Sequence, residues 1–152
     1  MENRDVRRPP RRTDKVVCYV TTGDHLLVVT HLDVPLTEAG VQVPAGTMER
    51  GETAREAALR EVQEETGLAD LSMVGVVGRD LYDIAPTRDE MQHRRYVHLT
   101  TQQDVSQRWL AGELDPDGGG EPQRWECWWL PLMHAHVLAA GQGRFVHRIG
   151  RR

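Results

Sequence analysis

Hydrophobic and polar positions alternate along much of this chain in a pattern that predicts a strand-rich domain. The runs with strand character are residues 15–22, 25–30, 41–43, 71–77, 94–100 and 125–130. The first two runs are separated by Gly23-Asp24, a dipeptide that supplies the positive φ of a tight hairpin turn. We expect an opening hairpin, a polar connection over residues 80–92 and a long loop over residues 102–120.

One segment has the pattern of a helix with a defined start and end. Thr53 and Glu56 form a T-x-x-E capping box, residues 54–66 contain no helix breaker, and Gly67 stands where a C-terminal cap belongs. A second helix is expected over residues 131–140, because a proline is well tolerated in a first helical turn.

Composition narrows the class of protein. The chain has 152 residues, of which 39% are hydrophobic and 28% charged, so we expect one globular domain. No apolar run approaches the roughly 18 to 20 residues that a membrane span needs, and no signal peptide is evident, so we expect a cytoplasmic protein without a membrane partner. Cys18 and Cys127 stand singly in apolar segments, which favours buried thiols over a disulfide or a zinc site.

The charge is unevenly distributed. The net charge of -4 argues against a domain that binds nucleic acid through an overall positive surface. Arginines nevertheless gather around Pro9-Pro10, at Arg4, Arg7, Arg8, Arg11 and Arg12. We expect residues 1–13 to form a flexible basic arm, either a solvated tail or a contact for an anionic partner such as nucleic acid, and residues 14–152 to form one domain.

The first predicted helix carries an acidic stripe beside its apolar face. On a helical wheel Glu61, Glu64 and Glu65 fall on one arc, next to the arc of Ala58 and Val62. Like charges at this spacing destabilise a helix unless something positive offsets them. Ligation by carboxylates alone favours a hard cation such as Mg²⁺ or Mn²⁺ over Zn²⁺, so the stripe predicts a divalent metal site.

Residues 46–68 resemble the Nudix box, G-x5-E-x7-R-E-U-x-E-E-x-G-U, in which U is apolar. Every fixed position is filled, by Gly46, Glu52, Arg60, Glu61, Val62, Glu64, Glu65, Gly67 and Leu68. At average amino-acid usage, a chance match in a chain of this length is rarer than about one in a million. The resemblance extends over most of residues 15–140.

This resemblance implies an α/β fold, a Nudix-type α/β/α sandwich in which a mixed, largely antiparallel sheet lies between the boxed helix and a C-terminal helix. It implies a Mg²⁺-dependent hydrolase, with Mn²⁺ as a substitute, in which water attacks phosphorus. The bond cleaved would be a pyrophosphate linkage in a small-molecule nucleotide substrate, a nucleoside diphosphate linked to another group.

Roles for individual residues follow from the resemblance by matching position. Glu64 and Glu65 would be metal ligands, and Glu61 a ligand or part of the base machinery. Arg60 would orient the carboxylates. Glu52 would have a metal or structural role. The carbonyl of Ala45, where relatives more often have glycine, would be a backbone ligand.

A further catalytic carboxylate is expected outside the box. Related enzymes often take a ligand or general base from a glutamate in the loop before the last strand. Glu121 is our candidate for this role, and Glu113 and Glu126 compete with it.

Substrate contacts are predicted at Gly46, Tyr82, Arg95 and Trp129. An aromatic face such as that of Trp129 can stack on a nucleobase. Strand alternation places Trp129 on the same face as Trp125, with Trp128 on the other, and core packing is expected for at least two of the three.

Three alternatives share the predicted fold. A nucleotide-sensing module would bind without turnover, although such domains often lose boxed glutamates. In an RNA 5′-end pyrophosphohydrolase, the arginine arm would bind RNA. An isomerase of isoprenoid diphosphates needs a reactive cysteine, and neither cysteine here has a recognisable active-site context. Residues 16–20 would support a homodimer if they form an exposed sheet edge.

Overall fold

The computed structural model of this chain describes residues 9–113 and 119–149. Its strands are β1 (Arg11–Thr22), β2 (His25–His31), β3 (Val41–Gln42), β4 (Ala45–Thr47), β5 (Ser72–Asp83), β6 (Glu90–Thr100), β7 (Trp109–Glu113) and β8 (Gln123–Pro131). Its helices are α1 (Leu36–Ala39), α2 (Ala54–Thr66) and two 3-10 helices, η1 (Leu132–Val137) and η2 (Val146–Arg148).

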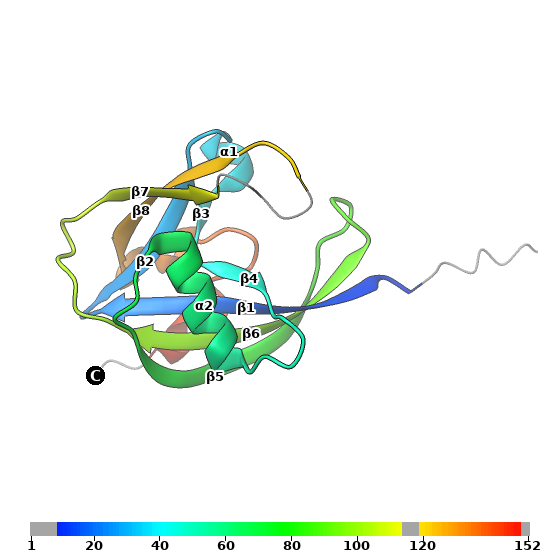
Figure 1. The fold of residues 1–152 in the computed structure, drawn as a ribbon, viewed down its shortest axis with the longest axis horizontal. Coiled ribbons are helices and arrows are strands. Elements are labelled where there is room, and N and C mark those ends of the chain that lie inside the picture. The colour runs from blue at the N-terminus through cyan, green and yellow to red at the C-terminus, as the bar shows by residue number, and fades with distance from the viewer. Residues whose placement is uncertain (1–8, 114–118, 150–152) are drawn as a thin grey trace, which may run out of the picture.

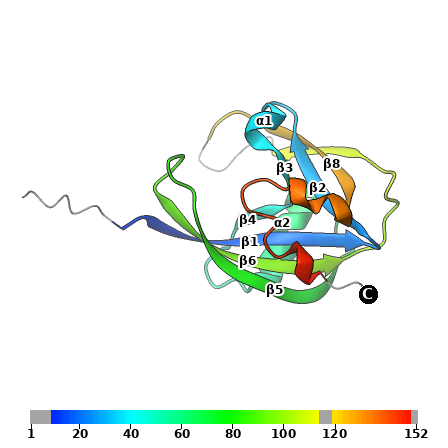
Figure 2. The same cartoon turned by 180° about the vertical axis from the view of Figure 1, so that it is seen from behind.

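The strands form one sheet in the order β5-β6-β1-β2-β8-β7, with β3 paired to β2 and β4 paired to β1. β1 and β6 run parallel, and the other paired strands are antiparallel. α2 packs on one face of the sheet (Figure 1), and the C-terminal segment with η1 and η2 lies on the other (Figure 2). The predicted α/β fold with a mixed, largely antiparallel sheet is confirmed.

β1 supplies side chains to both layers of the core, because successive strand residues point to opposite faces of a sheet. Val16 and Val20 pack with Val62 of α2 in one apolar cluster. Val17 and Tyr19 lie in the second cluster, on the side of the C-terminal segment. The strand that leads to the candidate site is therefore held rigidly from both sides.

α2 begins and ends where the sequence predicts. The Thr53 side chain accepts a hydrogen bond from the N–H of Glu56, and Gly67 has the left-handed conformation, with φ 79°, that closes the last turn. The cap fixes the register at which the carboxylates of α2 face the rest of the molecule.

Thr53→Ala is expected to lower the free energy of unfolding by about 1 kcal/mol, because it removes the cap of an otherwise unsatisfied backbone N–H group. Urea unfolding followed by far-UV circular dichroism measures this change. An unchanged free energy of unfolding would show that solvent replaces the cap at no cost.

Residues 16–20 lie in the middle of the sheet, so the expectation of an exposed edge is wrong. β6 pairs with this run on one side and β4 on the other, and each of the five side chains is at most 1% exposed. The pairing partners come from far along the chain, where a local pattern does not reveal them. This run therefore offers no edge through which a homodimer could form.

Three strand ends project from the sheet beyond the core (Figure 1). β1 starts at Arg11 and so includes the last three residues of the arm expected to be flexible, because residues 11–13 pair with residues 90–92 of β6. β5 and β6 also run further than predicted and leave only residues 84–89 as their connection. We call residues 11–15, 79–83 and 90–94 the strand extension. Arg4, Arg7 and Arg8 lie outside the described residues.

The second predicted helix is a short 3-10 helix rather than an α-helix. The chain becomes extended at Leu138, which bridges to Val41, and the N–H of Ala139 donates to the Val41 carbonyl. Pairing with β3 therefore ends the helix early. β7 was also not expected, since it lies within the predicted loop. In the described part of the chain, no helix is long and apolar enough to cross a membrane.

Candidate functional site

The carboxylate of Glu61 lies directly against the backbone of Gly46 in β4. A Cβ atom at position 46 would lie 2.0 Å from Cδ of Glu61, so only glycine leaves room for the carboxylate. The need at Gly46 is for space, because its φ lies outside the left-handed region. Glu61 is buried, and burial raises the pKa of its carboxyl although Arg60 opposes that shift.

Arg60 ties the glutamates of α2 to the loop before the helix. Its guanidinium donates to both carboxylate oxygens of Glu52, at 2.8 and 2.9 Å. It also donates to Glu61 at 2.8 Å, to Glu64 at 3.2 Å and to the carbonyl of Thr47 at 3.0 Å. A planar fork of donors suits this task, and the contacts agree with the orienting role predicted for Arg60.

Glu52 is held by Arg60 and by the backbone. Besides the two bonds from Arg60, its carboxylate accepts the N–H of Glu49 at 2.9 Å. The bonds from Arg60 lower the pKa of Glu52 to about 2. Of the metal and structural roles expected for Glu52, these contacts favour the structural one.

Glu52→Gln is expected to make the Tm of the protein depend less on pH between about 4.5 and 2. A carboxylate with a lowered pKa stabilises the folded state above its unfolded pKa of 4.5, and this contribution is lost as the pH falls toward 2. The difference in Tm between parent and variant should therefore be largest above pH 4.5 and shrink toward pH 2. Thermal unfolding across that range is the measurement, and a constant difference would contradict the account.

Glu65 lines a small hollow next to Ala45. One carboxylate oxygen accepts the N–H of Ala45 at 3.3 Å, and burial together with the charge of Glu61 raises the pKa of Glu65. The hollow has a volume of about 150 Å³ and is also lined by His31 and Glu113. Glu64 is the exposed member of the stripe.

The donor set fits a hard divalent cation. Glu52, Glu61 and Glu64 share the single guanidinium of Arg60, and Glu65 lies on the same helix without a basic partner among its described neighbours. Burial disfavours both Glu61 and Glu65 as anions, and the charge of Glu64 adds to this penalty at Glu61 as that of Glu61 does at Glu65. A cation would relieve the penalty. Within the described residues, no three His, Cys, Asp or Glu side chains are already arranged as a metal cage. Glu61 and Glu64 point instead to Arg60.

Two tryptophans hold the C-terminal end of α2. The indole N–H of Trp125 donates to the carbonyl of Glu65, and that of Trp109 donates to the carbonyl of Thr66, each at 2.7 Å. The last carbonyls of a helix lack partners within the helix, so these bonds anchor the turn that carries Glu65. Neither indole is predictable as a helix anchor from the local sequence pattern. The available signal was that a buried indole N–H needs an acceptor.

Trp129 belongs to the core, so its predicted stacking on a nucleobase is wrong. The residue is 5% exposed and packs against Trp109 with ring centroids 6.4 Å apart. The predicted alternation is confirmed, because Trp125 and Trp129 lie in one apolar cluster and Trp128 packs against the other. The indole side chain fills volume here and has no open face for a ligand.

The structure brings Glu113, rather than Glu121, to the hollow beside Glu65. Glu121 lines a different hollow, next to Asp33 and Arg124. Glu126 forms an ion pair with Arg108 at 2.5 Å. Sequence spacing alone did not decide between these three glutamates, because β7 was not expected and its pairing with β8 places Glu113.

A larger pocket opens on the strand-extension side of Gly46. It has a volume of about 530 Å³, and Lys15, Tyr82 and Arg94 are among its lining residues. Tyr82 therefore lines the same pocket as Gly46. Arg95 points to the other face of β6, where its guanidinium contacts Met48 and lies 3.5 Å from Asp14. The two predicted substrate contacts thus lie on opposite faces of the sheet.

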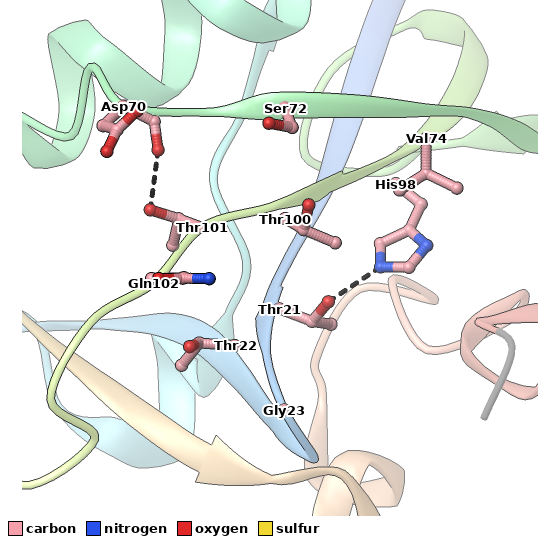
Figure 3. A pocket seen from close by; sticks show the side chains of 10 residues that line it. All are labelled: Thr21, Thr22, Gly23, Asp70, Ser72, Val74, His98, Thr100, Thr101 and Gln102. Atoms are coloured by element: carbon pink, nitrogen blue, oxygen red, sulfur yellow. Dashed lines mark hydrogen bonds between the residues drawn. The ribbon is translucent and has the colours of Figure 1, made fainter. Parts of the chain in front are cut away.

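Another hollow lies at the far end of β1 from Gly46 (Figure 3). Hydroxyl groups dominate its lining, and Thr21 forms a 2.8 Å hydrogen bond with the buried ring of His98. None of the boxed glutamates reaches it. It therefore takes no part in the candidate site.

Neither cysteine is poised as a nucleophile. Cys18 and Cys127 are both buried and free, and burial raises the pKa of each thiol, that of Cys127 to about 12. A thiol reacts as its thiolate, so these residues do not fit the isomerase alternative.

Comparisons with known proteins point to the same family as the residues of the site. The sequence profile of the NUDIX domain matches residues 11–149. The chain is 37% identical over 79 residues to Nudix hydrolase 25 of Arabidopsis thaliana, covering 51% of this chain and 43% of that protein. It is 30% identical over 97 residues to an RNA pyrophosphohydrolase of Brucella ovis, covering 60% and 54%. The matches thus span about half the length of these relatives.

A solved structure shows the same fold at low sequence identity. The MutT protein from Methanosarcina mazei Go1 superposes with a TM-score of 0.65 over 93% of this chain and 95% of that one, at 16% identity. The profile match covers most of the chain and contains the complete glutamate-bearing loop and helix described above. The chain is therefore a member of the Nudix family.

Proposed function

We propose that this protein is a Mg²⁺-dependent pyrophosphohydrolase that cleaves a diphosphate linkage in a nucleotide or nucleotide derivative. The observation that carries the proposal is the contact between the buried Glu61 carboxylate and the backbone of Gly46, with Glu65 on the same helix face. Burying adjacent carboxylates is costly, and the cost is recovered when a divalent cation binds. Hydrolases of this family generally depend on divalent metal ions.

Glu61, Glu64, Glu65 and the carbonyl of Ala45 would hold the cation. When bound, it polarises a phosphoryl oxygen and lowers the pKa of a bound water, with Mn²⁺ as an expected substitute. The oxygen-only donor set supports this choice of metal. Glu52 remains with Arg60 in this proposal.

The chain's own residues position the reaction. Arg60 holds Glu61 and Glu64 in fixed orientations through its hydrogen bonds, and the indole of Trp125 fixes the turn that carries Glu65. Glu113 replaces Glu121 as our candidate for the additional carboxylate, since Glu113 shares a hollow with Glu65. A carboxylate there would accept a proton from the attacking water.

A hydrolysis panel tests the proposal. We expect release of monophosphate or pyrophosphate from at least one of these classes: deoxynucleoside triphosphates, nucleotide sugars, ADP-ribose and dinucleotide polyphosphates. Activity should appear with Mg²⁺ or Mn²⁺ and disappear with EDTA. A metal-independent turnover, or metal-dependent binding without turnover of any substrate, would contradict it. The second result would favour a nucleotide-sensing module.

A second candidate, hydrolysis at the 5′ end of RNA, is favoured by one feature. Four arginines line a hollow beside Met48, namely Arg11, Arg12, Arg50 and Arg95, and they outnumber its three carboxylates, Asp14, Glu49 and Glu52. Such a cluster is suited to the phosphates of a polynucleotide. Including 5′-triphosphate RNA in the panel tests this candidate. Its turnover should fall steeply with salt, whereas that of a mononucleotide should change little.

A further inference from the structure

Lys15 is the only lysine among the 19 basic Lys and Arg residues of this chain. It lies on β1 opposite Thr47 of β4, one residue from the pair formed by Val16 and Gly46. An ammonium is a compact point charge, whereas a guanidinium is a wide planar fork. The one lysine of the chain thus lies next to Gly46 and Thr47.

The Lys15 ammonium is half-buried and held by a neutral group. It donates to the hydroxyl of Thr47 at 2.6 Å. No carboxylate within the described ranges forms an ion pair with it, although the charges of Glu90 and Glu61 both act on it. Burial lowers the pKa of Lys15, and the attraction of Glu90 and Glu61 only partly offsets this. A partly desolvated cation without an ion-pair partner is available to bind an anion.

Lys15 opens into the pocket that Gly46 lines, the larger of the two hollows next to Ala45. That pocket, of about 530 Å³, falls within the range of roughly 300 to 1,000 Å³ that is usual for small-molecule sites. The hollow beside Glu65, of about 150 Å³, is too small for a nucleoside by the same measure. A substrate whose diphosphate lies at Gly46 therefore has room for its organic group on the side of the strand extension.

One wall of the pocket is already fixed. The Arg94 guanidinium stacks on Tyr82, 3.9 Å from the ring centroid, and donates to Gln92 and to the carbonyl of Ala140. A Cβ at Gly141 would lie 2.9 Å from the Tyr82 ring, so the glycine permits this close packing. Arg94 is thus occupied in shaping the wall. Arg88 lies 3.6 Å from Glu90, so among the lining cations Lys15 is the one that no ion pair or packing contact occupies in the described residues.

We infer that the ammonium of Lys15 binds a phosphate oxygen of the substrate, whose nucleoside lies in the pocket between Gly46 and Tyr82. This inference rests on the proposed function for the nature of the substrate. Lys15 and Arg60 would then lie on either side of Glu61, with Lys15 contacting the substrate and Arg60 contacting the protein's own carboxylates. Lys15 acts in binding, so its loss should affect KM more than kcat.

The single lysine allows a direct test of phosphate binding. Reductive methylation with ¹³C-formaldehyde gives one ε-dimethylammonium signal, which is assigned by its absence from Lys15→Arg. Full-length protein is titrated with pyrophosphate and with α,β-methylene adenosine diphosphate, against sodium chloride at equal ionic strength. We expect a saturable shift with both phosphates and none with chloride.

Steady-state kinetics on a substrate from the panel complete the test. Lys15→Gln should raise KM about 10- to 100-fold with little change in kcat, the size expected for loss of one charged hydrogen bond. Arg124→Gln also removes one positive charge, but its arginine pairs with Asp33 elsewhere, so KM should not change. An unmoved Lys15 signal, or an unchanged KM in Lys15→Gln, would overturn the inference while leaving hydrolysis intact. A shifted signal without turnover of any substrate would support it and contradict the proposed hydrolysis.

Discussion

Replacing Glu65 by glutamine is expected to lower kcat about 1000-fold, equivalent to about 4 kcal/mol of transition-state stabilisation. The amide keeps the size of the side chain and its contact with the N–H of Ala45 but removes the charge that would hold the cation. The variant should remain folded. Without metal it should melt no lower than the parent, because the repulsion between Glu65 and Glu61 is removed.

Glu126→Gln is the matched control for this experiment. Glu126 lies on β8 and pairs with Arg108, so the same chemical change there should leave kcat unchanged. Initial rates at saturating Mg²⁺ and substrate measure both variants, and differential scanning fluorimetry with and without Mg²⁺ reports metal binding. If Glu65→Gln kept the parent's kcat and its thermal response to Mg²⁺, the metal assignment would be lost.

Gly46→Ala is expected to lower kcat about 100-fold through displacement of a carboxylate, since shifts of about 1 Å in a reacting group have effects of this size. The added methyl group would lie 2.0 Å from Cδ and 2.2 Å from Oε2 of Glu61. Because the Glu61 side chain is buried and bonded to Arg60, it has little room to yield. The carboxylate must move away from β4.

The control for Gly46→Ala is Gly143→Ala, whose methyl group meets its nearest neighbour, the carbonyl oxygen of Ala135, at 3.3 Å. Both variants lose a glycine, but only one affects Glu61. Combining Gly46→Ala with Glu61→Asp shortens the displaced side chain and should relieve the clash without restoring kcat. Parental kcat in Gly46→Ala would mean that the contact between Glu61 and β4 has no part in turnover.

Local features of the sequence were sufficient to predict α2 and the spacing of the glutamates along it. The cap at Thr53, the left-handed Gly67 and the glutamate spacing depend on neighbours within one or two helical turns. The close approach at Gly46 is also encoded locally, since glycine alone permits it.

Features that depend on distant partners were not predictable in the same way. The composition of residues 16–20 suits an edge strand and a central strand equally well. Pairing with β6 is what makes this strand a central one. Pairing of Leu138 with Val41 shortened the expected C-terminal helix. Glu113 reaches Glu65 only because β7 adds to the sheet beside β8.

The tryptophan contacts at the end of α2 have a consequence for the order in which the site forms during synthesis. The boxed helix leaves the ribosome well before Trp109 and Trp125, whose indoles anchor its last turn from 43 and 60 residues further along. Long-range contacts of this kind form late, because the intervening chain must first be closed into a loop. A nascent chain that ends before β7 would therefore carry every boxed residue and still leave Glu65 on an unanchored turn.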